Sequence, residues 1–160
     1  MPCAERTQAP ATPHRLLIVD DERDLCELIR AVAFANGFTS TIATTARECF
    51  AGIEAEPPTL ILLDLQLPGM DGVELLRVLA DSGCRSSIAI VSGLDRRIIE
   101  SAGRLARCLR LDLVGTLQKP VLLEDLTTLM RRAAERHQSN HRQAHAGGAG
   151  YRGDARVATG

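Results

Sequence analysis

Apolar and polar positions follow one another along the chain in two alternating patterns. Residues 16–19 form a short, unbroken apolar run, and apolar residues then recur at three-and-four spacing over residues 25–33. The unbroken run predicts a buried strand, and the recurring spacing predicts an amphipathic helix. Asn36 and Gly37 follow the periodic segment and predict the end of that helix.

The same alternation of strand and helix recurs as far as about residue 136. Five such units predict an α/β fold with a parallel sheet, because parallel strands need helical crossovers that cover both of its faces. We expect a flavodoxin-like (βα)5 three-layer sandwich with a parallel five-stranded sheet of order 2-1-3-4-5. The further strands are predicted near residues 38–43, 59–64, 87–92 and 112–117, and the further helices near residues 45–54, 71–81, 96–109 and 122–136.

Composition divides the chain into three zones. Residues 1–14 place three prolines among small and polar residues, and this predicts a flexible leader. Residues 15–136 carry the strand and helix pattern and predict one domain, because 160 residues of which 45% are hydrophobic can bury one good core. Residues 137–160 predict a polar helix extension followed by a disordered tail or linker stump without an apolar face.

Charge and hydropathy exclude several classes of partner. A net charge of −1 gives no electrostatic basis for direct binding to nucleic acid or to a membrane surface. No apolar run is long enough to span a bilayer, and residues 1–14 lack the apolar core of a signal peptide, so we expect a cytoplasmic protein. The cysteines are odd in number and form no C-x-x-C pair, which indicates small reduced core residues and neither a disulfide framework nor a zinc site. They are Cys3, Cys26, Cys49, Cys84 and Cys108.

Polar side chains follow four of the predicted strands. In an open parallel sheet the ligand crevice lies beyond the carboxyl ends of the strands, at the point where the strand order reverses. The order 2-1-3-4-5 makes the first and third strands neighbours, so it places Asp20 and Asp21 beside Asp64. The polar residues at the strand ends are Asp20, Asp21, Glu22, Asp64, Ser92 and Lys119.

Some of these residues also have a purely structural interpretation. Asp21 could cap the following helix, with Asp24 three residues on in the position of a capping box. Ser92, followed by Gly93, could be an ordinary turn residue. Asp64 is harder to explain in this way, because a carboxylate that closes an apolar strand is costly to bury unless it is paired or binds a metal.

Lys119 is the only lysine of the chain, in which the other basic residues are arginines. A compact ammonium suits a small phosphate site as a point charge, whereas a guanidinium needs more room and a bidentate geometry. Pro120 restricts the preceding lysine to extended geometry and so directs its side chain reproducibly.

Three carboxylates in one pocket repel one another at neutral pH unless they share protons or a cation. Oxygen ligands of this kind suit Mg²⁺, which keeps several waters and binds phosphate oxygens as well. The set therefore predicts acyl-phosphate chemistry, with Asp64 as the nucleophile. Magnesium and Lys119 would screen the charge of the transferring group, and the Ser92 hydroxyl would donate to its oxygens.

These residues together resemble the receiver domain of two-component response regulators, over about residues 15–136. The resemblance is carried by the acidic triplet 20–22, the stretch Asp64–Gly72 with sequence D-L-Q-L-P-G-M-D-G, Ser92, and Lys119 with Pro120, in this order. It implies a phosphorelay signalling module that accepts a phosphoryl group on Asp64. The donor would be a phosphohistidine on a sensor histidine kinase or on a histidine phosphotransfer protein.

The resemblance also implies roles for the residues around Asp64. Asp21, Asp64 and the main-chain carbonyl of Gln66 would bind Mg²⁺ directly, and Asp20 would act through water. Pro68 and Gly72 resemble the residues that shape the loop before the following helix. In physical terms the proline sets a rigid turn and the glycine provides a permissive backbone.

One position departs from the best-known receivers, which carry a switch aromatic three residues before the lysine. That position is Thr116, and the only tyrosine is Tyr151 in the tail. A smaller rearrangement of the loop after Ser92 and of the arginine-rich predicted helix 96–109 is our hypothesis for how the signal propagates.

Several functional alternatives stay open. The chain would not act as an enzyme on other substrates, apart from its own phosphorylation and slow autodephosphorylation. It could instead be a phosphorylation-independent pseudo-receiver interaction domain. Residues 113–120 are similar to receivers that precede cyclic-di-GMP phosphodiesterase domains. An output domain or target protein would bind the face of the last two predicted helices and the strand between them, and a homodimer remains open.

Overall fold

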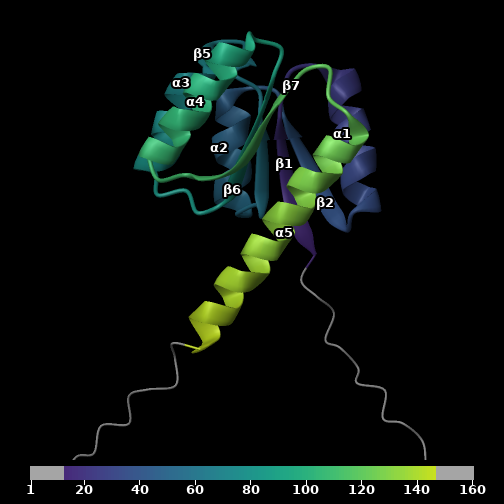
Figure 1. Cartoon of the computed structure of the whole chain (residues 1–160), viewed down its shortest axis with the longest axis vertical. Helices are drawn as coiled ribbons and strands as arrows, with labels where there is room; N and C mark the ends of the chain where they lie inside the picture. Colours follow the sequence, from purple (N-terminus) through teal and green to yellow (C-terminus); the bar gives the residue numbers. More distant parts are fainter. Residues whose placement is uncertain (1–12, 147–160) are drawn as a thin grey trace, which may run out of the picture.

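The computed structural model describes residues 13–146 of the chain, so most of the leader predicted over residues 1–14 and the tail after residue 146 lie outside it. Its main sheet is parallel and has the strand order β2-β1-β3-β6-β7, which confirms the predicted order 2-1-3-4-5 (Figure 1). The strands of this sheet are β1 (His14–Val19), β2 (Phe38–Ala43), β3 (Leu60–Leu63), β6 (Ser87–Ser92) and β7 (Asp112–Gln118).

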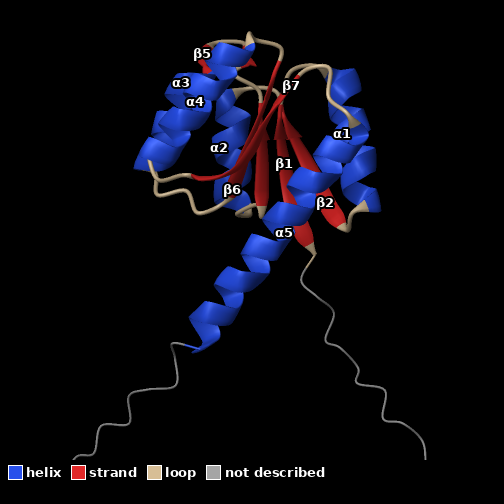
Figure 2. Cartoon of the chain, in the orientation of Figure 1, coloured by secondary structure: helices blue, strands red, loops and turns tan. Residues whose placement is uncertain are grey.

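Helices cover both faces of this sheet, as the strand and helix alternation predicted (Figure 2). One hydrophobic core lies between the sheet and α1 and α5, and a second lies between the sheet and α2, α3 and α4. None of the helices within residues 13–146 is long and apolar enough to cross a membrane. The helices are α1 (Arg23–Ala35), α2 (Ala46–Ala55), α3 (Gly72–Asp81), α4 (Arg96–Cys108) and α5 (Leu123–Ala146).

The unbroken apolar sequence of β3 follows from its position in the centre of the sheet. Leu60 and Leu62 pack into the core beneath α1 and α5, whereas Ile61 and Leu63 pack into the core on the opposite face. All four side chains are at most 2% exposed. Each fully buried side chain of this size contributes about 1.5–3 kcal/mol, so a strand buried on both sides must be apolar at every position.

Helix α5 extends well beyond the sheet. Its first half packs on the core through Leu126, Met130 and Ala133, and the helix then continues without interruption to Ala146 (Figure 1). The ring of His137 on α5 lies 5.8 Å from the ring of His14, which begins β1. The residues from 137 to 146 are therefore a continuation of α5 in the structure.

A small antiparallel hairpin, which the sequence pattern did not predict, follows β3. Its strands are β4 (Gln66–Leu67) and β5 (Met70–Asp71), and Gln66 pairs with Asp71. Gly69 adopts φ 83° in the turn between them, a conformation that other residues rarely adopt. The hairpin connects the end of β3 to the start of α3. It also fixes the direction of the backbone from Asp64 to Gln66.

The described cysteines are all free, as predicted. Cys26 and Cys49 are buried in the two cores, whereas Cys84 is half-buried. Cys108 is exposed at the end of α4, so its prediction as a core residue was wrong. Its place in the sequence next to apolar residues did not reveal that it faces away from the sheet.

Candidate functional site

The carboxyl ends of β1 and β3 bring two aspartates together. Val19 pairs with Leu63 in the parallel ladder, so Asp20 and Asp64 follow at the same level of neighbouring strands. The backbone N–H of Asp64 donates to the carbonyl of Val19 at 2.9 Å, which continues the ladder up to the carboxylate. Both aspartates are buried, at 3% and 4% exposure, and the sheet itself holds them there.

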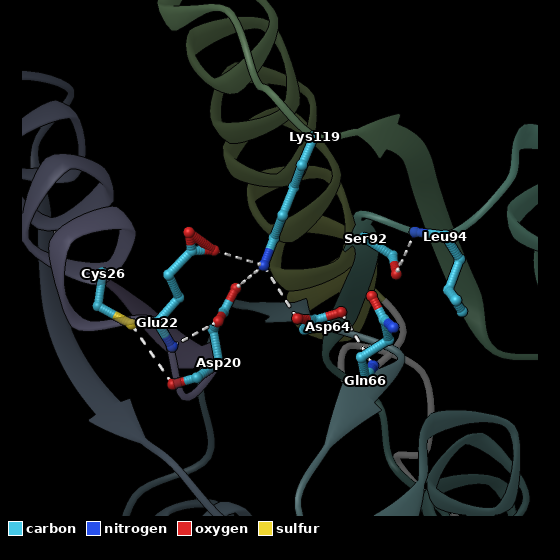
Figure 3. A network of polar contacts seen from close by, with 8 residues as sticks. All are labelled: Asp20, Glu22, Cys26, Asp64, Gln66, Ser92, Leu94 and Lys119. Atoms are coloured by element: carbon cyan, nitrogen blue, oxygen red, sulfur yellow. Dashed lines mark hydrogen bonds and ion pairs between the residues drawn. The ribbon is translucent and has the colours of Figure 1, made fainter.

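Lys119 reaches these carboxylates from the end of β7. Its Nζ lies 2.7 Å from Oδ2 of Asp20 and 2.9 Å from Oδ2 of Asp64 (Figure 3). Glu22 makes a third, longer contact, with 3.3 Å between its Oε2 and the same nitrogen. The single lysine of the chain is therefore the cation that the buried acids face.

Asp21 supplies a third carboxylate to the same place. One oxygen each of Asp20, Asp21 and Asp64 lies within 4.8 Å of the other two. The interpretation of Asp21 as a helix cap was wrong, because Glu22 is the N-cap residue of α1 and no side chain caps that helix. A compact set of carboxylate oxygens, two buried and one exposed, fits a hard cation such as Mg²⁺.

The buried charges shift one another's proton affinities. Burial raises the pKa of the Asp20 carboxyl, and the nearby Asp64 adds to this rise, against the hydrogen bond and charge of Lys119, which lower it. Burial alone would lower the pKa of Lys119, but its hydrogen bonds to Asp20 and Asp64 and their charges raise it above its ordinary value. Lys119 is therefore charged at neutral pH.

Ser92 and Gln66 lie on the other side of Asp64 from Asp20 (Figure 3). The backbone N–H of Gln66 donates to Oδ1 of Asp64 at 2.9 Å. Ser92 is fully buried at the end of β6, and its hydroxyl accepts the N–H of Leu94 at 3.3 Å. Ser92 therefore has the turn role that its sequence position suggested, at a place beside the acidic cluster.

Gly72 shapes the approach to this site by a close contact. A β-carbon at Gly72 would lie 2.4 Å from the Cα of Leu65 and 2.8 Å from its carbonyl oxygen, and no side chain can be accommodated at that distance. Positive φ values in this loop occur at Gly69, not at Gly72. The expectation that Gly72 provides backbone freedom was therefore wrong: it is needed because the start of α3 touches the residue after Asp64.

Three contacts of the site were not anticipated from the sequence. Glu22, which the sequence shows only as a member of the acidic triplet, contacts Lys119. The thiol of Cys26 donates to the carbonyl oxygen of Asp20 at 3.4 Å. Gln118, next to Lys119, donates from its side chain to the carbonyl of Leu94. Only the adjacency of Glu22 and Gln118 to predicted site residues was a signal in the sequence.

A large hollow in the described surface lies elsewhere. It has a volume of about 870 Å³, and its lining includes Arg15, Thr59 and Ser87, near the amino ends of β1, β3 and β6. None of the residues singled out at the carboxyl ends of the strands lines it. The acidic cluster lies at the other end of these strands, where Asp20 follows β1 and Asp64 follows β3.

Comparison with known proteins gives one consistent family. Residues 16–131 match the family described as the response regulator receiver domain. The response regulator MprA of Mycolicibacterium vanbaalenii is 32% identical over 119 residues, which are 74% of this chain and 49% of that protein. The DNA-binding response regulator MtrA of Mycobacterium tuberculosis is 40% identical over 70 residues, which are 43% of this chain and 31% of that protein. The chain therefore spans half or less of the length of these curated relatives.

Solved structures agree with this match. A CheY-like response regulator receiver domain protein from Methanospirillum hungatei is similar with a TM-score of 0.67 and 26% identity, covering 82% of this chain and 99% of that one. NtrX from Brucella abortus is similar with a TM-score of 0.70 and 25% identity, covering 81% of this chain and 29% of that one. Both the isolated domain and the longer protein therefore contain the fold described above.

Proposed function

The chain belongs to the receiver domain family of response regulators, and we propose that it acts as a phosphorylatable module that accepts a phosphoryl group on Asp64 with the help of Mg²⁺. The observation that carries this proposal is the position of Lys119, whose ammonium lies 2.9 Å from Asp64 and 2.7 Å from Asp20 in a largely buried site. For a member of this family, we expect a signalling role without catalysis on other substrates.

Asp64 is suited to act as the nucleophile. One of its oxygens accepts a hydrogen bond from the Gln66 N–H and the other accepts one from Lys119, so the carboxylate has a fixed orientation. In the transfer, a carboxylate oxygen of Asp64 forms a bond to phosphorus, and the bond from phosphorus to the donor's imidazole nitrogen breaks. The product is an acyl phosphate, and the imidazole leaves with the electron pair of the broken bond. Lys119 then faces the new negative charge, and the Ser92 hydroxyl donates to a phosphoryl oxygen.

The residues that would hold Mg²⁺ are Asp20, Asp21 and Asp64, together with the main-chain carbonyl of Gln66. When bound, the ion neutralises charge on the carboxylates and on the transferring group. The oxygen-only donors of the three aspartates, within 4.8 Å of one another, support this assignment. We propose residues 15–136 as the unit that carries the phosphorylation chemistry.

The partners follow from the family. Response regulators of two-component systems work with histidine kinases, so we propose a sensor histidine kinase or a histidine phosphotransfer protein as the donor. The phosphorylated module would signal to a target protein or an output domain through α4, β7 and α5. The curated relatives are longer than this chain, and one of them is named as DNA-binding. We propose a cytoplasmic setting for this exchange.

Intact-mass measurement tests the proposal. The chain is incubated with acetyl phosphate and Mg²⁺, and we expect a gain of one phosphoryl group that Asp64→Asn abolishes. Asp71→Asn is the matched control, because Asp71 is exposed, caps α3 through the N–H of Val73, and can be replaced by another good capping residue. No gain in the unmodified chain, or an undiminished gain in Asp64→Asn, would overturn the proposal.

A further inference from the structure

The side chain of Gln118 reaches from the end of β7 to the loop that follows β6. Its Nε2 donates to the carbonyl oxygen of Leu94 at 3.0 Å. In the sheet Gln118 is the β7 partner of Ser92, so the loop that it contacts begins at its own ladder partner. Gln118 is exposed. The contact is therefore a specific polar link and not a consequence of core packing.

Leu94 is held at both of its backbone polar groups. Its N–H donates to the Ser92 hydroxyl at 3.3 Å (Figure 3), while its carbonyl accepts the amide of Gln118. The N–H of Lys119 donates to the carbonyl of Ser92 at 2.8 Å. The buried hydroxyl beside Asp64, the loop before α4 and the end of β7 are thus joined by one chain of hydrogen bonds.

The position of β7 that lies three residues before Lys119 carries no aromatic side chain. Thr116 stands at that position, and a β-carbon at Gly103 on α4 would lie 3.2 Å from its methyl group. Helix α4 therefore packs tightly on β7 at this point, with no ring to move between them. Among the residues that the structure describes, the amide of Gln118 is the side-chain donor that ties the β6–α4 loop to β7.

We propose that Gln118 is a positioning residue of the phosphorylation site, whose side-chain amide holds the Ser92–Leu94 loop in the arrangement of the unphosphorylated domain. This inference rests on the proposed phosphorylation of Asp64. A Ser92 hydroxyl that turns to donate to a phosphoryl group moves the loop, because the N–H of Leu94 is bonded to that oxygen. This movement breaks the hydrogen bond between the carbonyl of Leu94 and the side chain of Gln118. A bond made in one state alone shifts the equilibrium against the other state.

The direction in which the affinity for a phosphoryl mimic changes distinguishes this role of Gln118 from a merely structural one. A glutamine that stabilised the loop equally in both states would change stability but not the affinity for a phosphoryl mimic. A glutamine bonded only in the unphosphorylated state opposes binding of that mimic. Loss of one hydrogen bond of this kind corresponds to about a 2- to 10-fold change in affinity.

Beryllofluoride with Mg²⁺, titrated by NMR into the full chain, is the probe. Gln118→Met keeps the length of the side chain and removes the donor, and Gln138→Met on the exposed part of α5 is the matched control. We expect Gln118→Met to bind beryllofluoride about 2- to 10-fold more tightly than the unmodified chain, and Gln138→Met to bind with unchanged affinity. The side-chain amide signals of Gln118 in the unmodified chain should also shift on binding.

Two results would overturn the role of Gln118 while the proposed phosphorylation of Asp64 stands. One is an affinity of Gln118→Met that equals or falls below that of the unmodified chain. The other, which needs no variant, is that the amide signals of Gln118 stay in place while those of Leu94 and Lys119 move. If the unmodified chain binds no beryllofluoride, the proposed phosphorylation of Asp64 fails and this inference fails with it. Binding with equal affinities defeats the role of Gln118 alone.

Discussion

The ammonium of Lys119 lies 2.9 Å from the carboxylate of Asp64, although 55 positions separate the two residues in the sequence. The same nitrogen also contacts Asp20, so one cation neutralises two carboxylates that are each 4% exposed at the side chain. In the described structure Lys119 thus supplies part of the positive charge that a bound metal ion would bring to this pocket. We therefore expect the charge at position 119 to be important for stability as well as for the proposed phosphoryl transfer.

Replacement of Lys119 by methionine should destabilise the domain. Two buried carboxylates would be left facing each other, and we expect the free energy of unfolding to fall by about 2–4 kcal/mol, which allows for the 16% exposure of the lysine side chain. Added Mg²⁺ should restore part of this loss, because it supplies the missing positive charge. Urea unfolding with and without Mg²⁺ measures both effects.

The control for this substitution is Arg30→Met. Arg30 pairs with Glu27 on the surface of α1, with side-chain exposures of 49% and 63%, so its loss should change stability by less than about 1 kcal/mol. An equal, small effect of both substitutions would show that the Lys119 contacts contribute no more than an exposed ion pair.

The affinity of the site for Mg²⁺ should decrease as the pH falls. Burial raises the pKa of Asp20 above its ordinary value, so a proton competes with the cation at a higher pH than it would at an unperturbed aspartate. We expect weaker binding at about pH 5 than at about pH 7, measured by NMR titration with Mg²⁺. Asp20→Asn should bind more weakly at neutral pH and depend less on pH. If Mg²⁺ binding by Asp20→Asn depends on pH as strongly as binding by the unmodified chain does, a group other than Asp20 causes the effect.

Gly72→Ala should disturb both the fold and the site. A methyl group there would lie 2.4 Å from the backbone of Leu65, so the hairpin or the start of α3 must shift, at a cost of about 1–3 kcal/mol. Because Leu65 is bonded to Asp64, Mg²⁺ binding should weaken too. Gly93→Ala is the matched control: its β-carbon would lie 3.5 Å from the Gln66 side chain, an ordinary contact. Thermal unfolding and Mg²⁺ titration of both variants check this, and equal behaviour of the two would contradict it.

Local patterns were sufficient to predict the fold and the group of residues at the strand ends. The apolar run of β3 can be buried only in the centre of a covered sheet, and this fixed the place of Asp64. The strand order then brought Asp20 and Asp21 to the same edge. These inferences use only the period of hydrophobicity and the geometry of parallel sheets, which the sequence expresses directly.

Other features depend on contacts that no local pattern encodes. The strands of the hairpin after β3 are two residues long, too short to show alternation. The contacts of Glu22 with Lys119 and of Gln118 with Leu94 depend on the directions of long side chains from distant elements. The need for Gly72 comes from a backbone approach and not from its own dihedral angles.

The tight contact between α4 and β7 predicts the effect of introducing an aromatic residue at position 116. The methyl group of Thr116 lies 3.2 Å from where a β-carbon of Gly103 would be, so a ring that points toward α4 would press against that helix. The adjacent hollow of about 210 Å³ includes Arg96, Glu100 and Asp125 in its lining, and a ring there would disturb their hydration. We expect Thr116→Phe to lower the free energy of unfolding by about 1–3 kcal/mol. Thr116→Val, which keeps the shape of the side chain, should cost less. If chemical denaturation finds the phenylalanine variant as stable as the valine variant, α4 does not pack against β7 as closely as the structure shows, and an aromatic switch could be accommodated in this domain after all.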